Sequence, residues 1–198
     1  MVCPGDENPL SAQLIFHLHG NVLGRRKLTQ VTGASESRVR TELEKLRERG
    51  YVCMERKGTS LTEQGREVYL GLLALVARVA SVSLSELGID EFSLGALLTA
   101  PEELSNQTWY YRDLAVQQGA SGAVIVEVNE EMRFLDTGEP LRKRNEEDLH
   151  KLKKTFPGWR KGRWLLLVSG SSRVAAARGL WTINLVVSKE VHFSKYHS

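Results

Sequence analysis

Basic side chains that could bind an anion are concentrated in two stretches of the sequence. Residues 25–57 contain ten Lys or Arg against five Asp or Glu, and residues 142–163 contain nine against three. The whole chain of 198 residues has a formal charge of only +3 at pH 7, so the clusters are local. Clustered Lys and Arg are typical of nucleic-acid binding, although a solvated helix face gives the same pattern. They indicate an anionic partner for at least one cluster.

The first cluster has the spacing of two helices joined by a tight turn. Residues 28–40 read LTQVTGASESRVR. Two apolar positions precede Gly33, which suits a turn, and the hydroxyl of Ser35 suits the N-cap of a second helix. This second helix is expected over 35–49, and a β-hairpin is expected over 51–61. The inward stripe of the second helix is Val39, Leu43 and Leu46.

Over about residues 10–70 this order of elements resembles the winged helix-turn-helix of prokaryotic and archaeal transcriptional regulators. The turn, the recognition helix, the hairpin or wing, and the Leu61-Thr62-x-x-Gly65 entry to the next helix follow in order. The resemblance implies that the recognition helix enters the major groove of DNA and that the wing contacts the backbone. Over its whole length the chain is similar to an archaeal type of regulator with a poorly characterised C-terminal domain.

Ten residues are expected to contact double-stranded DNA. They lie at the start of the helix before the turn, on the outer and flanking faces of the recognition helix, and at the tip of the wing. The ten are Arg25, Lys27, Ser35, Ser37, Arg38, Arg40, Thr41, Lys45, Arg56 and Lys57. Arginine can bind guanine through two hydrogen bonds, so Arg38 and Arg40 are expected to read bases, and the wing cations are expected to bind phosphates.

Acidic residues on the same helix support an alternative interpretation. Glu36, Glu42, Glu44 and Glu48 would repel phosphate if they were turned outward. A winged helix that binds protein and not DNA therefore stays open.

A fourth helix is predicted from the Thr62 cap to about Ala80. It is apolar on more sides than one small domain can cover. Burial of each such side chain is worth about 1.5–3 kcal/mol. We therefore predict a homodimer that uses Leu72, Leu73 and Val76.

The chain as a whole is expected to have an α+β fold. A winged helix-turn-helix domain over 1–80 would be followed by a small mixed α/β domain over 85–198, with a hinge at 81–87. The second domain is predicted to have a sensing or oligomerisation role. Its strands are expected over 92–99, 123–128, 132–135 and 163–169, and its helices over 104–118, 145–156 and from about 173, while 182–187 fits either element.

One loop of the second domain could bind an effector. Gly170, Ser171, Ser172 and Arg173 lie between a strand and a helix, where a carboxylate or phosphate can meet a helix N-terminus and an Arg. An ordinary turn with an N-cap is the alternative. The basic stretch 142–154 could touch the DNA backbone, but it also fits a solvated helix face.

Motifs of several other classes are missing. The sequence has no Walker A loop, GxGxxG, GxSxG or HExxH, so we expect no enzyme and no cofactor, with an unrecognised enzyme in the second domain as an alternative. Cys3 and Cys53 form no CxxC pair, and His17 and His19 point to different sides of a helix, so no metal site is expected. No signal peptide or membrane span is recognised, which favours a cytoplasmic location.

Overall fold

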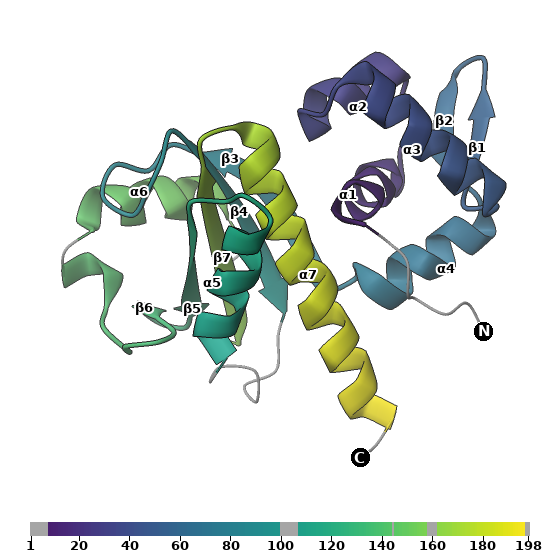
Figure 1. The fold of residues 1–198 in the computed structure, drawn as a ribbon. Helices are drawn as coiled ribbons and strands as arrows, with labels where there is room; N and C mark the ends of the chain where they lie inside the picture. Colours follow the sequence, from purple (N-terminus) through teal and green to yellow (C-terminus); the bar gives the residue numbers. More distant parts are fainter. Residues whose placement is uncertain (1–7, 100–106, 144, 158–161, 197–198) are drawn as a thin grey trace.

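The computed structural model describes residues 8–99, 107–143, 145–157 and 162–196. Figure 1 shows two units, a helical unit with a hairpin and a sheet covered by helices. The expected α+β fold, with a helical N-terminal part and a β-sheet after it, is confirmed. Among the described residues, no helix is both long and apolar enough to cross a membrane.

The helical unit has the predicted order of elements. Its elements are α1 (Pro9–Leu18), α2 (Arg25–Thr32), α3 (Glu36–Glu48), β1 (Val52–Glu55), β2 (Gly58–Leu61) and α4 (Glu63–Leu72). The side chains of Asn8, Ser35 and Thr62 cap α1, α3 and α4 by accepting backbone N–H bonds in the first turn of each helix. Gly33 ends α2 with a φ of 72°, a conformation that favours glycine.

The fourth helix is shorter than predicted. α4 ends at Leu72, and β3 (Val76–Val82) is a strand of the sheet. Leu73 is 1% exposed and Val76 is 2% exposed, so both are buried within the chain itself. The side chain of Leu72 is outside the described part of the chain. The prediction that Leu73 and Val76 form a dimer surface is therefore wrong.

The second unit is built on a five-stranded antiparallel sheet with the order β3-β4-β7-β5-β6. The other strands are β4 (Phe92–Thr99), β5 (Gly122–Val128), β6 (Met132–Phe134) and β7 (Arg163–Gly170). The helices are α5 (Thr108–Gln117), η2 (Leu141–Lys143), α6 (Glu146–Thr155) and α7 (Arg173–Tyr196). These elements confirm the predicted strands and helices, and residues 182–187 belong to α7. Residues 104–106 of the expected helix lie outside the described residues.

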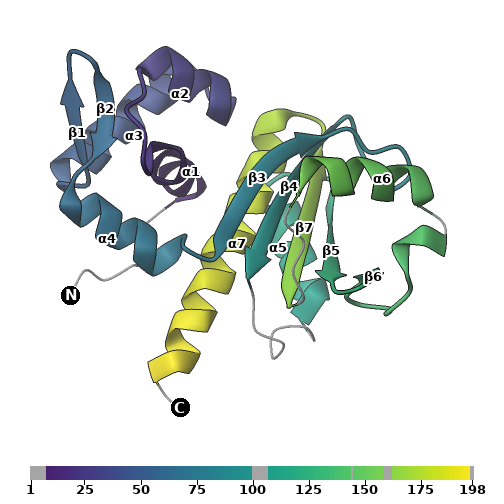
Figure 2. The ribbon, with the colours of Figure 1, turned by 180° about the vertical axis from the view of Figure 1, so that it is seen from behind.

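Helices cover both faces of this sheet. α5 and α7 lie on one face and α6 on the other (Figures 1 and 2). Side chains alternate along β7, so Leu166 and Val168 pack on the α7 side while Leu165 and Leu167 pack on the α6 side. This double burial explains the uninterrupted apolar run in the sequence of β7.

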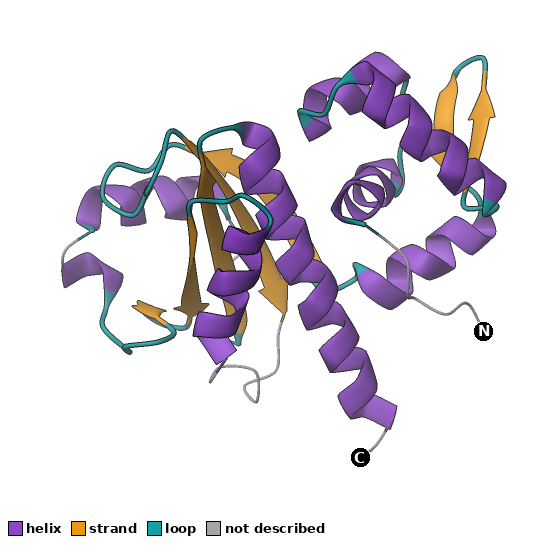
Figure 3. Cartoon of the chain, viewed as in Figure 1, coloured by secondary structure: helices purple, strands orange, loops and turns teal. Residues whose placement is uncertain are grey.

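The two units meet through helices. α7 packs against α1 and α4 as well as against its own sheet (Figure 3). The rings of Phe16 in α1 and Trp181 in α7 are 5.2 Å apart, and Trp181 is completely buried. Apolar residues of both units consequently form one continuous core.

The predicted hinge at 81–87 is also corrected. The chain passes from α4 into β3 over residues 73–75. The backbone N–H groups of Ser85, Glu86 and Leu87 each donate to the buried carboxylate of Asp148 at 2.8 Å. Burial opposes ionisation of this carboxylate, but the three N–H donors outweigh it and lower the pKa of Asp148. The segment is tied to α6 and does not join the two units.

Candidate nucleic-acid interface

Buried apolar residues along one side of α3 leave polar side chains exposed in the first half of the helix. Val39, Leu43 and Leu46 are buried, as the sequence predicts. Ser37, Arg40 and Thr41 are exposed on the other side of the helix. Polar side chains near the start of a helix can reach base edges when such a helix enters the major groove. Ser35 accepts the Arg38 N–H at 3.4 Å, so its side chain is used as the N-cap.

One flank of α3 faces the hairpin. Leu23 and Thr59 exchange two backbone hydrogen bonds of 2.9 Å, which bring the start of α2 beside β2. The concave surface between them, here called the hairpin groove, is lined by Arg25, Arg40, Glu44, Glu55, Arg56 and Lys57. The structure thus brings together four of the predicted DNA ligands, all exposed, from three separate elements.

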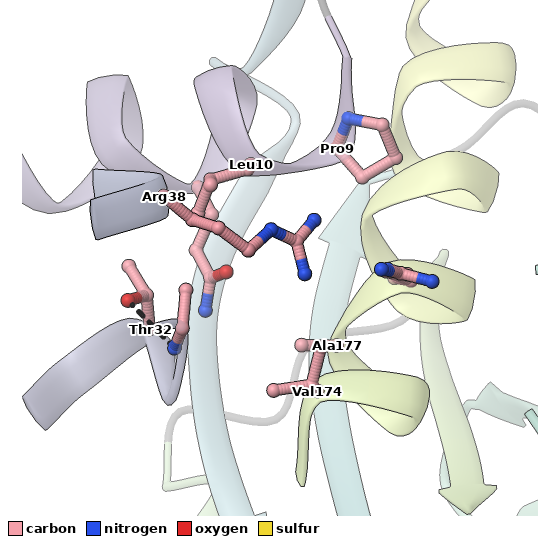
Figure 4. A pocket seen from close by; sticks show the side chains of 9 residues that line it. Pro9, Leu10, Thr32, Arg38, Val174 and Ala177 are labelled. Carbon is pink, nitrogen blue, oxygen red and sulfur yellow. Dashed lines mark hydrogen bonds between the residues drawn. The ribbon is translucent and has the colours of Figure 1, made fainter. Parts of the chain in front are cut away.

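The other flank of α3 faces the sheet unit. The surface here, called the inter-unit groove, is lined by Ser37, Arg38, Thr41 and Lys45 of α3 together with Gln118 and Arg178. Figure 4 shows the side chain of Arg38 reaching from α3 toward α7, where Val174 and Ala177 line an adjoining pocket. Arg38 and Arg40, which the sequence analysis paired as base readers, therefore lie on opposite flanks.

Sequence reasoning missed Gln118 and Arg178. Both residues belong to the second unit, and they reach α3 only because α7 packs against α1. No local pattern around either residue indicates this neighbourhood. The sequence indicates an anion-binding surface here only through the excess of Lys and Arg around α3.

Two of the four glutamates on α3 are neutralised within the chain. Glu42 is 7% exposed and accepts hydrogen bonds from Asn8 Nδ2 at 2.9 Å and from the Ser11 hydroxyl. Lys45 Nζ lies 3.5 Å from the same carboxylate. Glu44 is paired with Arg47 at 2.6 Å. The repulsion between α3 and a DNA phosphate is therefore weaker than it would be with four unpaired, outward carboxylates. This repulsion was the argument for a protein-binding module.

The tip of the hairpin carries two cations with different partners. Lys57 Nζ lies 3.1 Å from Glu55, and both side chains are exposed. An exposed pair of this kind contributes about 0–1 kcal/mol, so a phosphate can displace it. Arg56, like Arg25 and Arg40, has no ion pair within the described part of the chain.

Lys27 lines neither groove. Its amine donates to Gln30 Oε1 at 3.3 Å on the exposed side of α2. It stays a predicted phosphate ligand.

The predicted effector loop has other partners in the chain. Gly170 is the last residue of β7, opposite Phe92. Ser172 Oγ accepts the Ala175 N–H at 3.2 Å, so it serves as the N-cap of α7, while Ser171 is exposed. Arg173 donates from Nη2 to the Val31 carbonyl at 3.2 Å, at the end of α2. The loop thus joins the sheet unit to the end of α2, which the sequence did not indicate.

His17 in α1 and His19, the C-cap of α1, face cationic and aromatic neighbours. The His19 ring stacks on Tyr69 with centroids 3.7 Å apart. Burial, and then the charge of Arg173, lower the pKa of His17 to about 4. Among the described residues no group of three or more potential ligands is placed to hold a metal, and Cys3 lies outside them. Cys53 is exposed.

The second basic stretch belongs to a different surface. Three of its cations are paired with carboxylates: Arg142 with Glu131, Lys143 with Glu139, and Lys151 with Glu147. α6 lies across the sheet from α7 and therefore away from α3 (Figure 2). This arrangement fits a solvated helix face. Arg144 is outside the described residues.

The comparisons with known proteins support a DNA-binding first unit. Residues 16–76 match the family model described as the CggR N-terminal DNA binding domain. Among solved structures, the chain is similar to "Hypothetical protein PH0730 from Pyrococcus horikoshii OT3", with 22% sequence identity and a TM-score of 0.71. That alignment covers 93% of this chain and 95% of the other, and it shows a shared fold. No curated protein matches the chain.

Proposed function

We propose that the chain is a transcriptional regulator that binds double-stranded DNA through an N-terminal winged helix-turn-helix. α3 is the recognition helix and enters the major groove with Ser37, Arg40 and Thr41 toward the base edges. The hairpin is the wing and binds the backbone through Arg56 and Lys57. The protein acts by binding and not by catalysis.

The observation that carries the proposal is the placement of cations around α3. Arg25, Arg40, Arg56 and Lys57 come from α2, α3 and the hairpin, yet they surround one groove beside the exposed half of α3. Phosphate binding draws on exposed, weakly paired cations of this kind, whereas the core of a protein–protein interface is typically depleted of charged residues. The match of residues 16–76 to a DNA-binding family supports the same conclusion.

We further propose that the regulator works as a homodimer. Helix-turn-helix proteins read two half-sites with two copies of the recognition helix. The dimer must use another surface than Leu73 and Val76, because these side chains are buried within the chain. An effector at Gly170–Arg173 would bind the side chain that also donates to the Val31 carbonyl, so its binding would be felt at the end of α2.

Selection of bound sequences from a random pool of duplexes tests the proposal. We expect an enriched motif, made of two related half-sites about 10–10.5 base pairs apart, or a multiple of this spacing, if the protein is a dimer. Arg40→Ala should weaken binding by about 1–3 kcal/mol and relax the preference at one base pair. Arg112→Ala is the matched control, because Arg112 is exposed on α5 and pairs with Asp113. Recovery of no motif, with no affinity for any duplex at low salt, would contradict the proposal.

A further inference from the structure

The inter-unit groove places a cation of the sheet unit beside the recognition helix. Arg178 of α7 and Arg38 of α3 line both this groove and the adjoining pocket drawn in Figure 4. Lys45 lines the same groove about two helical turns further along α3. Three cations from two units therefore border one groove with a volume of about 480 Å³.

The packing of α7 fixes the position of Arg178. Ala177 and Trp181 are buried, and Trp181 packs on Phe16 of α1. Arg173, one helical turn before Ala177, bonds the end of α2. Residues four apart lie on the same side of a helix, so these three anchor one face of α7 to the helical unit. Arg178 follows directly at the rim of that face and is exposed.

Two cations of this groove lack an ion-pair partner in the described part of the chain. Arg38 and Arg178 have no ion pair among the described residues. Glu42, the one carboxylate that lines the groove in the described part of the chain, already accepts hydrogen bonds from Asn8 and Ser11 and is ion-paired with Lys45. Two exposed guanidinium groups that face a common space, with no ion-pair partner among the described residues, can bind an anion such as a phosphate.

We propose that Arg178 is a ligand of the DNA backbone. When α3 enters the major groove, the two sugar–phosphate strands that border the groove lie along the two flanks of the helix. The hairpin groove holds one strand, and the inter-unit groove holds a phosphate of the other strand between Arg178, Arg38 and Lys45. The sheet unit thereby takes part in DNA binding directly. This inference rests on the proposed function, because it requires that α3 binds duplex DNA.

The test is a salt titration of the full chain on the selected duplex. Arg178→Ala should reduce affinity several-fold at low salt and should reduce the slope of log K against log salt by about 0.9, the value for one phosphate contact. The ratio of the wild-type affinity to the Arg178→Ala affinity should fall about threefold between 50 and 200 mM salt, because the two slopes differ by one phosphate contact. Arg178→Lys keeps the charge and should keep the slope. Lys154→Ala removes a cation that is also exposed, on α6, and should match the wild type.

The outcomes separate the two proposals. If the wild type and Arg40→Ala differ while Arg178→Ala titrates like Lys154→Ala, the DNA-binding function stands and the role of Arg178 is wrong. If the wild type binds no duplex, both are wrong. A lowered melting temperature of Arg178→Ala would mean that its loss of affinity reports damage to the fold, and Arg178→Lys then decides. If the salt slope of Arg178→Lys is reduced as much as that of Arg178→Ala, the proposed backbone contact is wrong.

Discussion

Ser172, which caps α7, and Ser188, which lies inside that helix, have opposite surroundings. Ser172 caps the helix, and its hydroxyl accepts the Ala175 N–H. Ser188 is 2% exposed, and its hydroxyl has no hydrogen-bond partner within the described part of the chain. A lost N-cap costs about 1 kcal/mol, whereas a buried hydroxyl without a partner costs about 1–3 kcal/mol to keep.

The same substitution should therefore change stability in opposite directions. We expect Ser172→Ala to lower the free energy of unfolding by about 1 kcal/mol and Ser188→Ala to raise it by a similar amount. Urea unfolding of both variants beside the wild type measures this. A destabilised Ser188→Ala would show that the hydroxyl has a partner, such as a buried water, that balances its burial.

Residue roles could be predicted from the sequence only where the partner is close along the chain. Ser35 and Thr62 are helix caps, and their partners lie three residues away. The inward position of Glu42 depends on Asn8 and Ser11, more than thirty residues earlier. The contact of Arg173 with Val31 spans 142 residues, and no pattern around Arg173 could indicate it.

At the scale of elements, the start of α4 depends on one glycine. The Tyr51 carbonyl accepts the Thr62 N–H at 3.0 Å, so the base of the hairpin lies against the first turn of α4. A Cβ atom on Gly65 would lie 2.0 Å from that carbonyl oxygen. No side-chain rotation can relieve a clash between a Cβ atom and the backbone, so α4 or the hairpin would have to move.

Gly65→Ala should therefore destabilise the protein by roughly 3 kcal/mol. Gly71 lies in the same helix with open space around its Cα, so Gly71→Ala is the matched control. The control should gain up to about 1 kcal/mol because Ala is the better helix former. Thermal unfolding of the two variants measures the difference. Equal stabilities would contradict the close approach of α4 to Tyr51.

The error in the predicted fourth helix has a local cause. Val76 and Val79 are spaced for a helix as well as for a strand, and the register of β3 shifts between Val76 and Arg78. Such a bulge removes the strict alternation by which a strand is recognised. β4 and β7 have no such interruption over their paired residues, and their long apolar runs made them predictable.

For the whole molecule, the interface between the units contains a histidine that resists protonation. Burial, and then Arg173, lower the pKa of His17 from 6.5 to about 4. Between these values an unfolded chain binds a proton at His17 that the folded chain does not. This site therefore makes the protein less stable as the pH falls from 6.5 to 4, by about 3 kcal/mol in total.

His17→Gln should remove this part of the acid destabilisation. Urea unfolding at pH 7 and near pH 4.5 gives the change in stability for each protein, and the change should be smaller in the variant than in the wild type. His150→Gln, at an exposed position on α6, is the control and should behave like the wild type. The interpretation is wrong if His17→Gln loses as much stability as the wild type does.

The division into a helical unit and a sheet unit could be predicted, but their shared core could not. The order of strands in the sheet, β3-β4-β7-β5-β6, joins segments that are distant in the sequence. α7 completes both units because it packs on the sheet and on α1. The second flank of the candidate DNA surface, with Arg178, follows from that packing alone.

An NMR titration of isotope-labelled protein with the selected duplex tests the central claim most directly. If α3 and the hairpin bind DNA, the largest changes in amide chemical shift will fall on Ser37, Arg40 and Thr41 and on the tip of the hairpin at Arg56 and Lys57. The amides of α6 will stay unchanged, because this helix lies across the sheet. Binding that shifts α6 and leaves the first half of α3 unchanged would contradict the account.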